Sequence, residues 1–174
     1  MPPEKRSSPI KTAKEKVIPL KTLLVELEKH REAGRKVVFT NGCFDILHPG
    51  HILYMEQARN CGDLLVVGMN TDDSVRRLKG PARPLNPQED RAIQLAGLAS
   101  VDYVTYFDED TPIDLIKAVR PDVLVKGGDW TIENIVGADF VMACGGQVHS
   151  LPFHQGYSTT SLIEKIRTLK AEDL

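Results

Sequence analysis

Short β-rich runs alternate with helical patterns along most of the chain, and this alternation constrains the fold more than any other feature. The runs typical of strands are residues 36–40, 64–69, 103–107, 123–125 and 147–151. Residues 64–67 are all apolar, which is typical of a central parallel strand that helices cover on both faces. The pattern predicts the α/β class: a single-domain, doubly wound parallel sheet of five strands with right-handed crossovers.

The segments between these runs carry helix start and stop signals. Helices are predicted at residues 21–32, ending before Gly34, and at 158–170, with further helices that begin at Pro49, Asn86-Pro87 and Thr111-Pro112. Asn86 and Glu89 have the spacing of a capping box. The apolar stripe of the helix from Pro49 is Ile52, Met55, Ala58 and Cys61. Residues 1–16 are polar and contain proline, so we expect a flexible leader before a folded domain at 17–174.

Composition excludes several classes of function. The 174 residues suffice for one domain with a substantial core. Lys and Arg number 22 against 24 Asp and Glu, whereas a nucleic-acid binder usually carries a clustered basic face. The sequence has no apolar stretch long enough to cross a bilayer and no signal-peptide pattern, so we expect no membrane partner. Three widely spaced cysteines indicate neither a disulfide framework nor a CxxC metal site, which favours the reducing cytoplasm.

The segment TNGCFDILHPGH, residues 40–51, follows the first predicted strand at the sheet edge where doubly wound proteins bind ligands. Asn41 and Gly42 permit a tight turn that brings the backbone close to a ligand. With His48 near the N-cap, His51 lies three residues on, so both imidazoles can face the helix N-terminus, which favours a phosphate. Two other interpretations are open: the histidines and Cys43 could ligate a metal, or His48 could cap the helix while His51 is solvated.

This segment resembles the signature of the HxGH nucleotidyltransferase superfamily. Together with NTDDSVRRLKG, RPLNPQEDR, LVKGGDW and GYSTTS, it is most similar to the D-glycero-D-manno-heptose 1-phosphate adenylyltransferases of lipopolysaccharide-core biosynthesis. The resemblance implies that 17–174 is a Rossmann-like nucleotidyltransferase domain that transfers an adenylyl group from ATP to the sugar 1-phosphate. The products would be ADP-heptose and pyrophosphate. The same resemblance implies Mg²⁺ bound with ATP, a sugar kinase on a separate polypeptide, and a homo-oligomer.

The resemblance, with the chemistry of the residues, assigns roles to individual positions. His48, His51 and Lys79 are predicted to be catalytic, because they would stabilise phosphate charge during transfer. The predicted nucleotide-binding residues are Thr40, Asn41, Gly42, Phe44, His48, His51, Arg91, Gly127, Ser158, Thr159 and Thr160. The predicted sugar-phosphate-binding residues are Asp45, Lys79, Arg83 and Asp129. No residue is predicted to be a metal ligand.

Each of these motifs also has a purely structural interpretation. The hydroxyl cluster at 158–161 could be a helix cap and nothing more, and Asp129 could be a turn residue. The cations at 76–79 could form a solvated helix face, and Arg91 could form a surface ion pair.

Rival functions are cytidylyl transfer, adenylyl transfer to another acceptor such as pantetheine phosphate or a flavin phosphate, and non-catalytic ATP binding. Cytidylyltransferases usually have RTEGIS before the Thr pair. This chain has FHQGYS there, at 153–158, which favours ATP over CTP.

Overall fold

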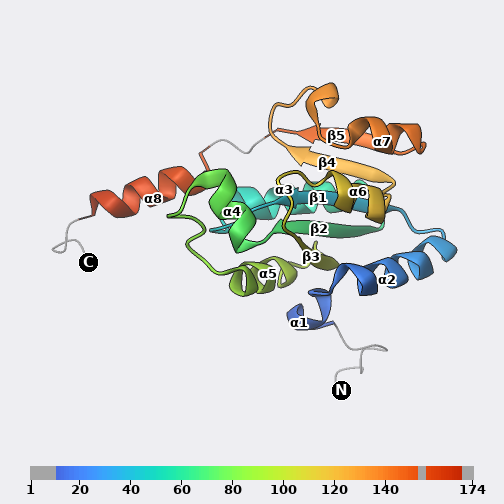
Figure 1. Ribbon diagram of the computed structural model, residues 1–174, viewed down its shortest axis with the longest axis horizontal. Helices are drawn as coiled ribbons and strands as arrows, with labels where there is room; N and C mark the ends of the chain where they lie inside the picture. Colours follow the sequence, from blue (N-terminus) through green and yellow to red (C-terminus); the bar gives the residue numbers. More distant parts are fainter. Residues whose placement is uncertain (1–10, 153–155, 170–174) are drawn as a thin grey trace, which may run out of the picture.

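A five-stranded sheet in the order β3-β2-β1-β4-β5 forms the centre of the protein, and every neighbouring pair of strands is parallel (Figure 1). The computed structural model describes residues 11–152 and 156–169. The strands are β1 (Val37–Gly42), β2 (Leu64–Asn70), β3 (Tyr103–Phe107), β4 (Val123–Gly127) and β5 (Gln147–Leu151). The predicted fold class, an α/β domain with a parallel sheet of five strands, is confirmed.

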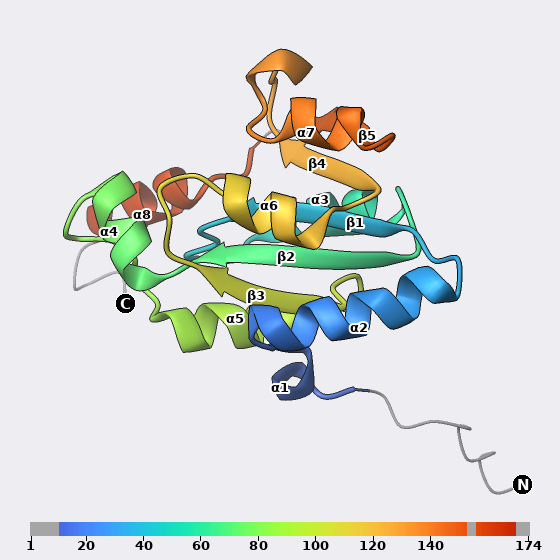
Figure 2. The same cartoon turned by 45° about the vertical axis from the view of Figure 1, so that its right-hand side comes forward.

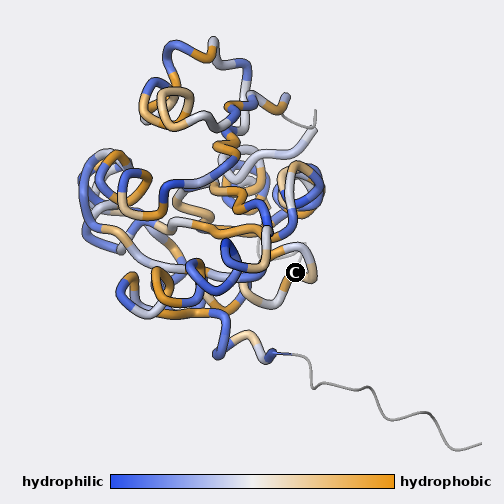
Figure 3. Tube along the Cα trace, turned by 90° about the vertical axis from the view of Figure 1, so that its right-hand side faces the viewer, coloured by the Kyte–Doolittle hydropathy of each residue, from blue (hydrophilic) through white to orange (hydrophobic). Residues whose placement is uncertain are grey.

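Helices cover both faces of this sheet (Figure 2). The helices on one face are α2 (Leu20–Glu32), α6 (Ile113–Val119) and α7 (Ala138–Ala143), and those on the other are α1 (Ala13–Lys16), α3 (Pro49–Arg59) and α5 (Gln88–Ala96). Hydrophobic and hydrophilic stretches alternate along the helices, as expected where one helix face packs on a sheet (Figure 3). The sheet therefore separates two apolar cores, one containing Leu23 and Ile116, the other Met55 and Leu95.

Three shorter elements complete the described chain: α4 (Asp72–Lys79), the 3₁₀ helix η1 (Ile132–Asn134) and α8 (Thr159–Thr168). Helix α4 follows β2, and α8 extends away from the sheet (Figure 1). None of the helices in the described parts of the chain has the length and apolar character needed to cross a membrane.

The expected flexible leader is corrected for residues 11–16. These residues include α1, and Lys16 donates hydrogen bonds of 2.8 and 3.2 Å to backbone carbonyl groups in the segment before β3. Val17 then forms a parallel bridge with Val104 on the edge strand β3. This part of the leader is therefore ordered, because it covers the outer edge of the sheet. The remainder, 1–10, lies outside the described residues.

Two helix details predicted from spacing are also wrong. Pro87, not Asn86, is the N-cap of α5, and no side chain caps that helix. The amide of Asn86 instead donates a 2.6 Å hydrogen bond to the backbone carbonyl of Asp45. In α3, Met55 and Ala58 of the predicted stripe are buried and Cys61 packs against the same core, but Ile52 remains 38% exposed and Tyr54 is buried instead. Apolar spacing gave a helix but did not determine which neighbouring side chain faces the sheet.

Strands β1 and β4 separate near their carboxyl ends, where the strand order reverses. Their pairing is confined to Val38–Val123 and Phe39–Leu124, although both strands continue for three more residues. The Tyr54 hydroxyl lies in this gap, 2.6 Å from Thr40 Oγ1 and 3.3 Å from the Val125 carbonyl oxygen. Because ligands of doubly wound sheets bind at such a switch point, the gap is the natural place for the site.

Candidate active site

The loop after β1 reverses direction at Phe44, which has a left-handed backbone with a φ of 48°. The Phe44 ring folds back over Gly42, where an added Cβ would lie 2.9 Å from two ring carbons. The same ring meets His51 edge to face, with centroids 5.5 Å apart and planes at 76°. Gly42 is therefore a steric requirement, because a side chain there would displace the ring that supports His51.

The two histidines of the HxGH segment are brought together at the start of α3. His48 is the N-cap residue and His51 lies in the first turn. Their rings stack with centroids 3.8 Å apart and planes at 18°. The Nδ1 atom of each ring is buried and has no hydrogen-bond partner among the described residues. The pair thus presents two ring nitrogens at the positive end of a helix dipole.

Both imidazoles are neutral at neutral pH. Burial, followed by the charges of His48 and Lys79, lowers the pKa of His51 to about 4. Burial also lowers the pKa of His48. A neutral imidazole carries one N–H donor, and a phosphate bound nearby would raise both pKa values by favouring the charged form. The influence of Lys79 on His51 places the lysine charge in the electrostatic neighbourhood of the histidine pair.

Gly50, the glycine of the HxGH segment, allows a distant part of the chain to approach the histidines. An added Cβ at Gly50 would lie 3.0 Å from the Tyr157 Cβ and 3.1 Å from His48 Nδ1. The Tyr157 ring is nearly parallel to the His48 ring, at 15° and a centroid distance of 6.2 Å. The site predicted from the sequence did not include Tyr157, although its place just before four hydroxyl residues was the available signal.

The predicted hydroxyl cluster lies at the start of α8, beside the loop that leads to His48. Ser158 is the N-cap, and its hydroxyl accepts a 2.9 Å hydrogen bond from the Ser161 N–H. Thr159 donates a 3.4 Å hydrogen bond to the Ile46 carbonyl oxygen, and Thr160 is exposed. The structural interpretation as a cap is confirmed, and it leaves Thr160 available to a ligand. Residues 153–155, used above to favour ATP, lie outside the described residues.

The Asp45 carboxylate is occupied by donors from the protein. It is 2% exposed and accepts hydrogen bonds from Arg83 Nε at 2.6 Å, Leu85 N at 2.8 Å and Asn86 N at 2.9 Å. Burial by itself raises the pKa of Asp45, but the two backbone N–H groups and the Arg83 guanidinium together lower it below its usual value. These contacts hold the loop at 83–86 in place. Sugar binding by Asp45 and Arg83 stays a prediction that they do not test.

Arg91 is fully buried, so its interpretation as a surface ion pair is wrong. Its three guanidinium nitrogens donate to the Asn86 carbonyl at 3.1 Å, to the Cys43 and Asn70 carbonyls at 2.6 and 3.0 Å, and to the Asp72 carboxylate at 2.7 Å. Arg91 therefore joins the loop after β1 to the end of β2 and the start of α4. Nucleotide binding by Arg91 stays a prediction.

The remaining predicted residues lie at exposed ends of α4 and β4. Lys79 is the last residue of α4 and is exposed. Gly127 ends β4, and its carbonyl accepts a 3.1 Å hydrogen bond from the Trp130 indole. Asp129 is exposed and its carboxylate has no hydrogen-bond or ion-pair partner within the described ranges. The hydrogen bonds that shape this loop therefore do not involve Asp129. Thr40 and Asn41 lie on β1, across the gap from β4, and the Thr40 hydroxyl is hydrogen-bonded to the Tyr54 hydroxyl.

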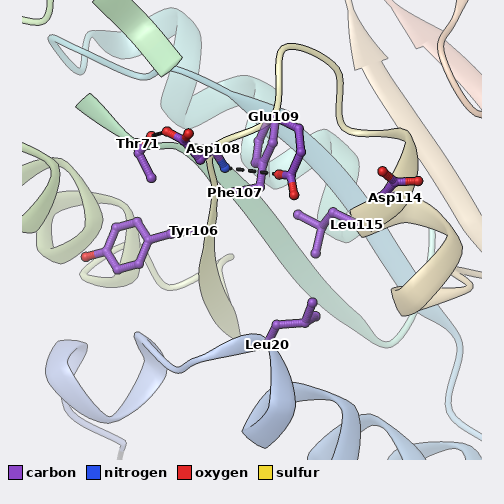
Figure 4. A pocket seen from close by; sticks show the side chains of 8 residues that line it. All are labelled: Leu20, Thr71, Tyr106, Phe107, Asp108, Glu109, Asp114 and Leu115. Carbon is purple, nitrogen blue, oxygen red and sulfur yellow. Dashed lines mark hydrogen bonds between the residues drawn. The ribbon is translucent and has the colours of Figure 1, made fainter. Parts of the chain in front are cut away.

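A separate depression of about 340 Å³ lies at the same sheet edge, beside the ends of β2 and β3 (Figure 4). Its lining residues are Leu20, Thr71, Tyr106, Phe107, Asp108, Glu109, Asp114 and Leu115. None of these is a predicted site residue, and three of them are acidic. A triphosphate would be repelled here, whereas the histidine pair offers neutral donors and a nearby lysine.

Comparison with known proteins gives a consistent result. The family model described as cytidylyltransferase-like matches residues 39–165, a range that includes every predicted site residue. The bifunctional protein HldE of Marinomonas sp. (strain MWYL1) is 59% identical over 149 residues, which are 86% of this chain and 31% of that protein. The HldE protein of Hyphomonas neptunium is 54% identical over 88% of this chain and 32% of its own length. The chain therefore spans about a third of the length of these curated relatives.

A solved structure is similar as well. The crystal structure of the lipopolysaccharide core biosynthesis protein from Thermoplasma volcanium GSS1 superposes with a TM-score of 0.56 at 28% sequence identity. The match covers 72% of this chain and all of that chain. The sheet and the helices around it are thus shared with a protein of that name.

Proposed function

This chain belongs to the cytidylyltransferase-like family of nucleotidyltransferases, and on that premise we propose that it transfers the adenylyl group of ATP to D-glycero-D-manno-heptose 1-phosphate. The products are ADP-heptose and pyrophosphate. The acceptor follows from the five segments that resemble heptose 1-phosphate adenylyltransferases. The similarity to proteins named HldE and to a lipopolysaccharide core biosynthesis protein supports the same assignment.

One observation carries this proposal: the stacked pair His48 and His51 at the N-terminus of α3, beside the gap between β1 and β4. In the proposed reaction, a phosphate oxygen of the acceptor attacks the α-phosphorus of ATP. The bond from that phosphorus to the bridging oxygen breaks, and pyrophosphate leaves with the electron pair. The acceptor is already an anion at neutral pH, so the protein needs no covalent intermediate, and catalysis is positioning and charge stabilisation.

We assign the imidazole rings of the two histidines to the α- and β-phosphate oxygens, whose charge grows during transfer. Lys79 reduces repulsion between the two anionic substrates. The backbone after β1, Gly127 and the hydroxyls of Ser158–Thr160 hold the nucleotide, and Asp129 accepts hydrogen bonds from the sugar. The contacts of Asp45, Arg83 and Arg91 hold the surrounding loops. Sugar-phosphate binding by Asp45 and Arg83 and nucleotide binding by Arg91 stay part of the proposal.

Mg²⁺ enters this proposal with the nucleotide. Within residues 11–152 and 156–169, no group of three or more His, Cys, Asp or Glu side chains is placed to hold a metal ion. Mg²⁺ is commonly held by substrate phosphates and water in such sites, with few protein ligands. No step above depends on a bond between the protein and a metal. A sugar kinase that supplies the acceptor and a homo-oligomeric assembly are also part of the proposal.

The test is incubation of the chain with ATP, Mg²⁺ and heptose 1-phosphate, followed by mass analysis of the products. We expect ADP-heptose and an equal amount of pyrophosphate. A grid of ATP and CTP against glycerol 3-phosphate, pantetheine phosphate and flavin phosphate separates the rival transferases. Binding of ATP without pyrophosphate release for any acceptor would overturn the catalytic assignment and favour a nucleotide-binding module.

A further inference from the structure

Lys126 is a partly buried cation without a counter-ion. It lies on β4, and within the described residues its side chain forms no ion pair and donates no hydrogen bond. Burial lowers the pKa of Lys126, so the fold holds this charge at a cost. Lysine is rarely buried unless it is paired, which makes the missing partner informative.

The side chain of Lys126 projects from the face of the sheet opposite to the histidines. Side chains alternate along a strand, and Leu124 belongs to the core under α2 and α6, whereas Val123 and Val125 belong to the core under α3. Lys126 therefore follows Leu124. His48 and His51 are on α3, which covers the other face. The gap between β1 and β4 opens beside both groups.

Two polar residues are placed near Lys126. Ser150 is its cross-strand partner on β5, and Cys43 is close enough to influence the pKa of Lys126. Cys43 lies 3.8 Å from the side-chain oxygen of Asn70, whose amide nitrogen donates to Ser74 Oγ at 2.9 Å. No carboxylate forms an ion pair with Lys126 among the described residues. Because the thiol and the amide are engaged within the protein, the Lys126 ammonium is the donor left for an anionic ligand with oxygen acceptors.

We infer that the Lys126 ammonium binds the phosphate group of the acceptor substrate, across the β1–β4 gap from the histidines. The inference rests on the proposed function. In an in-line displacement, the nucleophile and the leaving group are on opposite sides of the phosphorus atom. Histidines on one side suit the departing pyrophosphate, and a cation on the other suits the incoming phosphate. The Lys126 ammonium thus has a counter-ion only when the acceptor is bound.

The experiment compares Lys126→Met with Lys126→Arg and with Lys117→Met, which removes an exposed lysine on α6. Loss of a hydrogen bond between charged groups typically corresponds to about 10- to 100-fold in binding. For Lys126→Met we expect the KM for the sugar 1-phosphate to rise by about that factor while the KM for ATP stays within about twofold. Lys126→Arg recovers part of the loss, and Lys117→Met changes neither constant.

Thermal unfolding separates binding from a structural role. Removal of an unpaired, partly buried charge leaves the Tm of Lys126→Met unchanged or higher, whereas a structural lysine would lower it. Equal increases in both KM values, or an unchanged KM for the acceptor, would refute the inference.

If the wild-type chain proves inactive with every sugar 1-phosphate, the proposed function fails by itself. Protection by inorganic phosphate in thermal unfolding then tests Lys126 directly: we expect stabilisation of the wild type that Lys126→Met abolishes and Lys117→Met retains. Equal protection of all three proteins would place the anion elsewhere and refute the inference.

Discussion

Polar groups on the two sides of the carboxyl end of β1 differ in whether they have hydrogen-bond partners within the protein. Toward β2, Asp45 and Arg91 are almost or fully buried, and each of their charged atoms meets protein partners. Toward β4, the ring nitrogens of His48 and His51 and the ammonium of Lys126 have no partner among the described residues. Satisfied buried charges fix a structure, whereas unsatisfied ones are costly and indicate where a ligand completes the bonding.

Among substitutions that test this difference, the largest expected loss in the free energy of unfolding is at Arg91. Arg91→Met leaves the Asp72 carboxylate and three backbone carbonyls without their donor. Removing one partner of a buried charged network typically costs about 3–5 kcal/mol. We expect a loss of that size in the free energy of unfolding, measured by urea denaturation. The control Arg76→Met breaks an exposed i,i+3 ion pair and is expected to cost less than about 1 kcal/mol. Similar losses in both variants would contradict a structural role for Arg91.

On the other side, the histidines should matter for rate and not for folding. His51→Ala removes a donor that the proposed mechanism uses only as charge develops. We expect kcat to fall by about 10²- to 10³-fold, as for loss of one oxyanion donor. The free energy of unfolding should change little, because His51 Nδ1 has no partner to lose among the described residues. His149→Ala on β5 is the matched control and should keep its kcat. Near wild-type turnover in His51→Ala would remove the histidines from the mechanism.

The contribution of the buried Asp45 carboxylate to stability should depend on pH. Its folded pKa is lower than its unfolded value, so its contribution to stability is present above pH 4 and is lost as the pH falls through the folded pKa. Asp45→Asn should cost about 1.5–3 kcal/mol at pH 7, the usual range for hydrogen bonds to a charged group. Urea denaturation from pH 7 down to pH 3 should show the wild-type and variant values converging. A difference that stays constant over this range would contradict the assignment of the charge to Asp45.

The sequence was sufficient for the sheet but not for the polar networks around it. The β-rich runs predicted all five strands within two residues of their ends. The signal is clearest for β2, which is buried along its whole length and is apolar at residues 64–67. The HxGH spacing likewise predicted that His48 and His51 would meet. The partners of Asp45 and Arg91 could not be predicted, because most of them are backbone atoms that the fold brings together from loops distant in sequence. Tyr54 escaped prediction for a related reason: its importance comes from a strand gap that no local pattern shows.

The smallest expected effect on stability is at the start of α8. There one hydroxyl cluster contains both a group bonded within the protein, Ser158, and a group left for a ligand, Thr160. Ser158→Ala removes the side chain that caps the helix, a loss of about 1 kcal/mol for a helix by itself. Because α8 buries no residue, we expect the global free energy of unfolding to change by less, while hydrogen exchange of the α8 amides accelerates. Because the Ser158 hydroxyl is also proposed to hold the nucleotide, we expect the KM for ATP to rise while the KM for the acceptor does not. Thr168→Ala, whose hydroxyl bonds the Lys165 carbonyl at the other end of the same helix, is the control. An equal KM for ATP in the two variants would show that the Ser158 hydroxyl caps the helix but does not bind the nucleotide.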